Sequence, residues 1–139
     1  MAAATALFMS LKPGDHVVAP SVMYWSLRNW LNDFARTWGL DVEFVPSADL
    51  DALAKAMRPG KTALVWLETP SNPLWDVTDI QSASDIAHKA GLDIIAFGNM
   101  SIQEVAQMIF DIVGRPSSRR YRMLATQRPP RPRAPWHSG

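Results

Sequence analysis

The chain has 139 residues and no cysteine, a length that suits a single domain with a modest core. Without cysteine it can form no disulfide, thiol nucleophile or thiolate metal site. A hydrophobic fraction of 47% and a mean hydropathy of −0.08 are ordinary for a soluble protein, and no apolar run approaches the ~20 residues that cross a bilayer. Residues 1–11 carry no basic side chain, so we expect a cytoplasmic protein without a secretory signal.

The net charge of +1 conceals two oppositely charged parts. Residues 1–114 hold all 13 acidic residues and seven basic ones, a net charge of −6. Residues 115–139 hold seven Arg and five Pro but no acidic residue, a net charge of +7. Few side chains in this second part could form a core, so we predict that residues 115–139 are a disordered basic tail.

Apolar spacing and turn residues predict alternating helices and strands along the chain. We predict helices over residues 2–11, 24–38, 49–57, 79–90 and 101–113. We predict strands over residues 16–20, 42–45, 62–67 and 92–97. The run Thr62–Leu67 is continuously apolar, which is typical of a strand buried on both faces in a parallel sheet. The sequence therefore predicts an α/β fold with a partial, doubly wound parallel sheet.

The segment 24–38 shows how these helices are identified. Its apolar residues recur at helical spacing and predict one buried face, formed by Leu27, Trp30, Leu31, Phe34, Ala35 and Trp38. Gly39 follows directly and is a natural C-terminal stop. We also expect most of the six tryptophans to face the core, and Trp25 and Trp75 to serve packing rather than a pocket.

The segment Glu68–Pro73 follows the buried strand 62–67, where open α/β sheets bind their ligands. Pro70 and Pro73 make this loop rigid, and the Asn72 amide between them could bind a ligand oxygen. Ser, Asn and Pro are also common turn formers. On the residues alone, a plain strand-to-helix turn is the favoured interpretation.

The order of several segments points to a known family. These segments are Leu11-Lys12-Pro13-Gly14-Asp15-His16-Val17-Val18, then Tyr24, then Val65-Trp66-Leu67-Glu68-Thr69-Pro70-Ser71-Asn72-Pro73, then Asp79-Ile80 and Ala87-His88-Lys89-Ala90-Gly91. Over residues 1 to about 96 the ordered set resembles the Cys/Met metabolism PLP-dependent family, which includes cystathionine synthases and lyases, methionine gamma-lyase and the homoserine sulfhydrylases. The resemblance implies part of the large pyridoxal 5'-phosphate-binding domain of a fold-type I enzyme.

The resemblance also implies roles for particular residues. Tyr24 falls where the family places the tyrosine that stacks on the cofactor ring, and Asn72 where an asparagine binds the cofactor's phenolic oxygen. Met1 matches a methionine at a helix start whose backbone N–H groups hold the phosphate. These three residues are the expected cofactor-binding set. Glu68 matches an acid that we expect to be a structural anchor rather than a catalytic group.

The likeness fails where the family's catalytic residues are expected. Gly98 occupies the position of the Asp that pairs with the pyridine nitrogen, and glycine cannot supply that charge. No Ser-x-Thr-Lys motif with the Schiff-base lysine occurs, and no Lys follows Lys89. We therefore expect no catalytic residue in the chain, which divides into a partial cofactor domain (1–96), a non-family helical segment (97–114) and the tail.

Two functional hypotheses follow. The first is a fragment of a transsulfuration enzyme, a C–S lyase or synthase acting on cystathionine or activated homoserine, whose parent is expected to be a homotetramer. The fragment is expected to be inactive and to bind the cofactor poorly if at all. The alternative is a non-catalytic module that binds polyanions or nucleic acid through its basic tail, which lacks a recognisable nucleic-acid-binding fold. His16, His88 and His137 have no metal-ligand spacing, so we expect no metal site.

Overall fold

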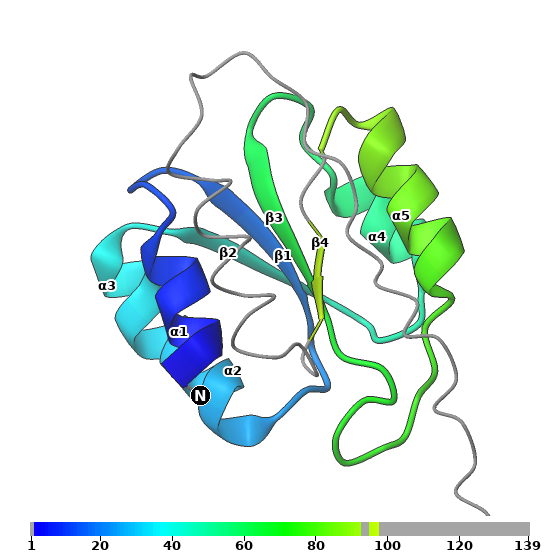
Figure 1. Ribbon diagram of the computed structural model, residues 1–139, viewed down its shortest axis with the longest axis horizontal. Coiled ribbons are helices and arrows are strands. Elements are labelled where there is room, and N and C mark those ends of the chain that lie inside the picture. Colours follow the sequence, from blue (N-terminus) through cyan, green and yellow to red (C-terminus); the bar gives the residue numbers. More distant parts are fainter. Residues whose placement is uncertain (1, 93–94, 98–139) are drawn as a thin grey trace, which may run out of the picture.

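The computed structural model describes residues 2–92 and 95–97 (Figure 1). The helices are α1 (Ala2–Met9), α2 (Trp25–Trp30), the π-helical turn η1 (Leu31–Ala35), α3 (Arg36–Trp38), α4 (Leu50–Ala56) and α5 (Ile80–Lys89). The strands are β1 (His16–Pro20), β2 (Asp41–Val45), β3 (Thr62–Leu67) and β4 (Ile95–Phe97). Met1, the helix predicted over 101–113 and the tail predicted over 115–139 lie outside the described residues.

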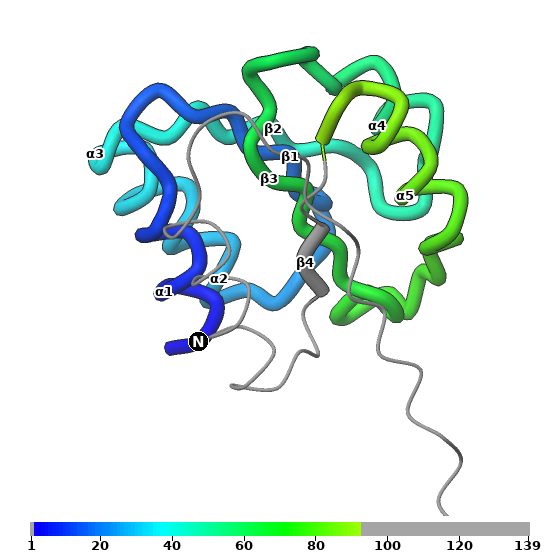
Figure 2. Tube along the Cα trace, turned by 45° about the horizontal axis from the view of Figure 1, so that its top comes forward, coloured from blue at the N-terminus to red at the C-terminus, as the bar shows by residue number. Residues whose placement is uncertain are grey.

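The strands form a parallel sheet in the order β2-β1-β3-β4. Val18 lies beside Glu43 on one side and Val65 on the other, and Val65 lies beside Ile95. Helices α1, α2 and α3 cover one face of the sheet and α4 and α5 cover the other, as both views show (Figures 1 and 2). This arrangement confirms the predicted partial α/β fold with a doubly wound parallel sheet. All four strands end at the same edge, which we call the carboxyl edge.

Helices α2, η1 and α3 form one continuous rod over residues 25–38, as the apolar spacing predicts. Its buried positions include Leu27, Leu31 and Ala35. The prediction of a wider apolar face was wrong at two positions, because Phe34 is 44% exposed and Trp38 is 42% exposed. The π turn η1 alters the angular spacing of side chains, so a strict helical period does not place these two rings.

The core lies on both faces of β1 and β3. Phe8 of α1 links the layers there, with its ring centroid 6.0 Å from that of Trp30 and 5.4 Å from that of Trp66. Among the tryptophans of the described part, Trp66 is buried and Trp30 is partly buried, while the others are exposed: Trp25, Trp38 and Trp75. The expectation that most tryptophans face the core was therefore wrong for the described ones.

Side-chain caps and left-handed glycines fix where the helices begin and end. The carboxylate of Asp49 accepts the Ala52 N–H at 2.9 Å at the start of α4, and Asp79 accepts the Ser82 N–H at 3.1 Å at the start of α5. Gly39 has φ = 100° and ends α3, as predicted. No helix in the described part of the chain is long and apolar enough to cross a membrane.

Candidate functional site

Two loops meet at the carboxyl edge because β1 and β3 are neighbours in the sheet. The loop after β1 ends at Tyr24, whose carbonyl accepts the N–H groups of Leu27 and Arg28 at the start of α2. The backbone N–H of Tyr24 donates to both carboxylate oxygens of Glu68, at 3.0 and 3.1 Å. Glu68 is the first residue after β3. Its carboxylate therefore fixes the beginning of α2 relative to the β3 loop.

The loop after β3 closes on itself around Ser71, which is only 2% exposed. The Ser71 N–H donates to the Asp76 carbonyl at 2.9 Å, and the Asp76 N–H donates to the Ser71 hydroxyl at 3.0 Å. Trp75 N–H donates to the Ser71 carbonyl at 2.9 Å. The peptide bonds preceding Pro70 and Pro73 are both cis. The loop is thus held by its own hydrogen bonds and presents Asn72 to solvent.

An open hollow of about 480 Å³ lies against this loop and is lined by Glu68, Pro70, Ser71, Asn72, Pro73 and Trp75. Small-molecule sites in proteins typically measure about 300–1,000 Å³. Trp75 is 77% exposed and adopts φ = 63°, a left-handed conformation uncommon outside glycine. The backbone of the loop therefore directs a large ring to the rim of the hollow rather than into the core, contrary to the packing role expected for Trp75.

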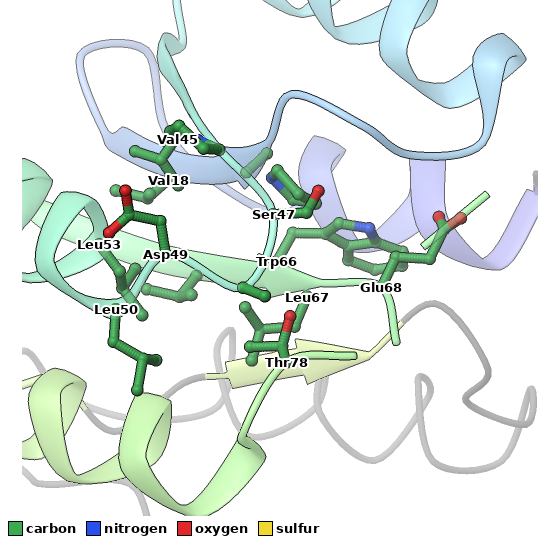
Figure 3. Close-up of a pocket in the computed structure, with 15 residues that line it drawn as sticks. Val18, Val45, Ser47, Asp49, Leu50, Leu53, Trp66, Leu67, Glu68 and Thr78 are labelled. Atoms are coloured by element: carbon green, nitrogen blue, oxygen red, sulfur yellow. The ribbon is translucent and has the colours of Figure 1, made fainter. Parts of the chain in front are cut away.

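A second, far smaller gap lies between the strand ends and α4 (Figure 3). Its volume of about 20 Å³ corresponds to roughly one water molecule. Val18, Leu53 and Leu67 contribute to a mainly apolar lining, with Glu68 at its end. The gap cannot hold a cofactor, so the candidate site is the larger hollow on the loop.

Trp66 adds an unpaired polar group directly before the site. Its side chain is 4% exposed, and its indole Nε1–H has no acceptor among the described residues. Buried donors of this kind are uncommon in folded proteins. Trp66 is the second-last residue of β3 and precedes Glu68 by two residues.

The structure brings Tyr24 and Asn72 of the expected cofactor-binding set to the same edge through Glu68, while Met1 and Gly98 lie outside the described residues. The sequence analysis did not identify Ser71 as the centre of the loop. The only indication in the sequence is its hydroxyl group between two prolines, and this pattern fits a plain turn equally well. The described residues contain no cluster of His, Asp or Glu able to hold a metal ion.

Residues 1–108 match the family described as Cys/Met metabolism PLP-dependent enzyme. The chain belongs to this family. It is 32% identical over 111 residues to the cystathionine gamma-synthase of Mycobacterium leprae, covering 78% of this chain and 28% of that protein. It is 34% identical over 116 residues to the cystathionine gamma-lyase of Bacillus subtilis, covering 81% of this chain and 30% of that protein. The chain thus spans less than a third of these relatives.

Comparison of the fold with solved structures gives a similar protein. The crystal structure of metB from Corynebacterium glutamicum superposes with a TM-score of 0.66 at 29% identity, covering 72% of this chain and 26% of that one. The family match extends to residue 108, beyond the boundary expected at residue 96. The family depends on pyridoxal phosphate. The hollow lined by Asn72 has a volume suited to a group of that size, and Glu68, which also lines it, accepts the backbone N–H of Tyr24.

Proposed function

We propose that the chain is part of a pyridoxal-phosphate-dependent transsulfuration enzyme, a C–S lyase or synthase acting on cystathionine or activated homoserine, and that it is catalytically inactive as it stands. The observation that carries the first half is the Glu68–Tyr24 contact, because it joins two of the family's motif segments at the ligand-binding edge of the sheet. The second half rests on Gly98, which occupies the position of the family's Asp, and on the placement of the four lysines.

Each of the proposed cofactor residues has one task. The Tyr24 ring would stack on the cofactor ring, the Asn72 amide would donate to the phenolic oxygen, and the backbone at Met1 would hold the phosphate. Pyridoxal phosphate itself supplies an electron sink for the substrate's α carbon when it is bound. Glu68 would act indirectly, by fixing the start of α2 and with it the position of Tyr24.

The lysines of this chain stand in the wrong place for covalent attachment of the cofactor. Lys12 and Lys61 lie in the turns that lead into β1 and β3, at the amino edge of the sheet. Lys55 and Lys89 lie in the last turns of α4 and α5, which run back from the carboxyl edge. All four are therefore at the far side of the sheet from Asn72. This placement, together with Gly98 in the position of an Asp, supports inactivity.

Reversible cofactor binding tests the residue roles. We expect wild-type chain to bind pyridoxal phosphate weakly in equilibrium dialysis, and Tyr24→Ala and Asn72→Ala to weaken that binding about tenfold each, the effect of ~1.4 kcal/mol. Asn32→Ala in η1 is the matched control and should bind like wild type. Equal binding by all four proteins would contradict the assigned roles. Release of a 2-oxo acid from cystathionine above a protein-free control would contradict inactivity.

We infer further that the parent enzyme is a cytoplasmic homotetramer acting on a small amino acid. The cytoplasm is the default compartment for a chain that can form no disulfide, and the family resemblance supports the assembly. The polyanion-binding alternative depends on the seven Arg of 115–139. Its test is filter binding at two salt concentrations, because phosphate contacts of that kind weaken steeply as salt rises. We expect no retention at physiological salt.

A further inference from the structure

A buried histidine lies at the opposite, amino edge of the sheet, away from the candidate site. His16 begins β1, and its side chain is 0% exposed. Its Nδ1 lies 2.9 Å from the hydroxyl oxygen of Thr62, the first residue of β3. Its Nε2 lies 3.2 Å from a carboxylate oxygen of Glu43 in β2. One imidazole therefore contacts both neighbouring strands of β1.

The hydrogen-bond partners of His16 determine which imidazole nitrogen carries the proton. The Thr62 hydroxyl oxygen already accepts the Arg58 backbone N–H at 2.8 Å, so its own hydrogen is free to donate to His16 Nδ1. His16 Nε2–H then donates to Glu43, whose same oxygen accepts the Arg58 guanidinium at 2.6 Å. Arg58, Thr62, His16 and Glu43 thus form a closed ring of hydrogen bonds, which we call the His16 ring. Both imidazole nitrogens of His16 have a hydrogen-bond partner when the imidazole is neutral.

Further charges surround the His16 ring. Asp41 of β2 accepts from the Arg58 guanidinium at 2.6 Å and from Lys61 Nζ at 3.2 Å. The charged groups that face His16 are therefore Glu43 and Asp41 from β2, and Arg58 and Lys61 from the segment between α4 and β3. Arg58 is already paired with both carboxylates, so a second cation beside it gains little.

Protonation of His16 conflicts with this geometry. An Nδ1–H would have to donate to the Thr62 oxygen, and the Thr62 hydroxyl hydrogen would lose its acceptor in the ring. Burial lowers the pKa of His16 below its ordinary value, and the charge of Arg58 lowers it further, against the opposing influence of Asp41 and Glu43. The buried site therefore favours the neutral imidazole.

We propose that His16 is a pH-sensitive latch: the neutral imidazole ties β1 to β2 and β3 at the amino edge, and its protonation opens the His16 ring and loosens both strand pairings. The unfolded histidine has a pKa of about 6.5, above the folded value. The latch therefore contributes fully above about pH 6.5 and is lost as the pH falls through the folded pKa. Carboxylates with lowered pKa values, such as Asp41, act only at more acidic pH.

The test compares urea unfolding of the full chain at pH 7.5 and pH 5.5. We expect the wild-type midpoint to fall at the lower pH. His16→Gln keeps a donor and an acceptor but cannot titrate in this range, so its midpoint should change far less. His88→Gln on α5 is the matched control and should keep the wild-type difference. An equal difference in wild type and His16→Gln would overturn the proposal.

A second measurement needs no variant that removes the histidine. The imidazole ¹³Cε1–¹H resonance of His16 should titrate below pH 6.5 in the folded chain. Arg58→Gln removes the neighbouring cation and should shift this titration to higher pH, whereas Glu43→Gln removes an anion and should shift it to lower pH. Amide exchange of residues in β1 should quicken through the same pH range. A His16 titration at or above its ordinary value would overturn the latch.

Discussion

The two carboxylate oxygens of Glu68 share the backbone N–H of Tyr24, at 3.0 and 3.1 Å, across 44 residues of sequence. This contact connects the end of β3 to the beginning of α2. A carboxylate in this place also faces the positive end of the helical rod over 25–38. The family motif thus contributes to the fold as well as to the proposed cofactor site.

Removing that carboxylate should release the start of α2. We expect Glu68→Ala to lower the free energy of unfolding by about 1 kcal/mol, the net value of one hydrogen bond. Glu68→Gln keeps an acceptor oxygen and should lose less. Amide exchange of Tyr24, followed by NMR, should quicken in Glu68→Ala. Asp33→Ala, which removes an exposed carboxylate from η1, is the control; if it has the same effect on Tyr24, the contact has no specific role.

Substitution of Gly39 tests how the helical rod over 25–38 ends. Alanine there would combine φ = 100° with a Cβ only 3.0 Å from the Pro13 Cβ. The left-handed conformation alone costs an L-residue about 1–2 kcal/mol, and the contact adds to this. Gly60 has φ = 74° with open space around it, so Gly60→Ala is the matched control. We expect a lower thermal midpoint for Gly39→Ala than for Gly60→Ala, and equal midpoints would contradict the role of the Pro13 contact.

The centre of the sheet should be the most sensitive part of the core. Leu64 of β3 is fully buried, so Leu64→Ala should cost about 2–5 kcal/mol and could unfold the chain outright. Leu74 on the loop after β3 is 63% exposed, and Leu74→Ala should change stability by less than about 0.5 kcal/mol. Circular dichroism of both variants during urea unfolding checks this. A similar loss in both would mean that the described sheet is not the core of the protein.

The cap of α5 should respond to acid. Hydrogen bonds from Ser82, first from its backbone and then from its side chain, lower the pKa of Asp79. The ionised carboxylate therefore stabilises α5 above about pH 4, and the contribution is lost as the pH falls through the folded pKa. Asp79→Ser keeps a capping oxygen that does not titrate. We expect its helix content, measured by circular dichroism, to vary less with acid than that of wild type; an unchanged acid response would show that Asp79 is not the titrating group.

The local features of the fold were predictable because single residues encode them. The bounds of β1 and β3 follow from apolar runs between turn residues, and Gly39 and Asp79 mark helix ends through backbone and capping chemistry. The π turn η1 was not predictable, since periodicity assumes a uniform helix. The exposure of Trp25 was missed because an aromatic side chain carries no sign of whether another element covers it.

The candidate site was predictable only in part. The position of Asn72 after a buried strand indicates a ligand-binding loop, and the family resemblance assigns it a partner atom. The tie between Glu68 and Tyr24 depends on the sheet order, which places β1 beside β3. The closure of the loop on Ser71 depends on backbone hydrogen bonds that no side-chain pattern specifies. Both features required three-dimensional structure.

Covalent capture of the cofactor tests the central claim most directly. The chain is incubated with pyridoxal phosphate, reduced with borohydride, digested and analysed by mass spectrometry, with an intact family enzyme as the positive control. We expect only scattered, substoichiometric modification of Lys12, Lys55, Lys61 and Lys89. A stoichiometric adduct on one of these lysines would contradict the proposed inactivity.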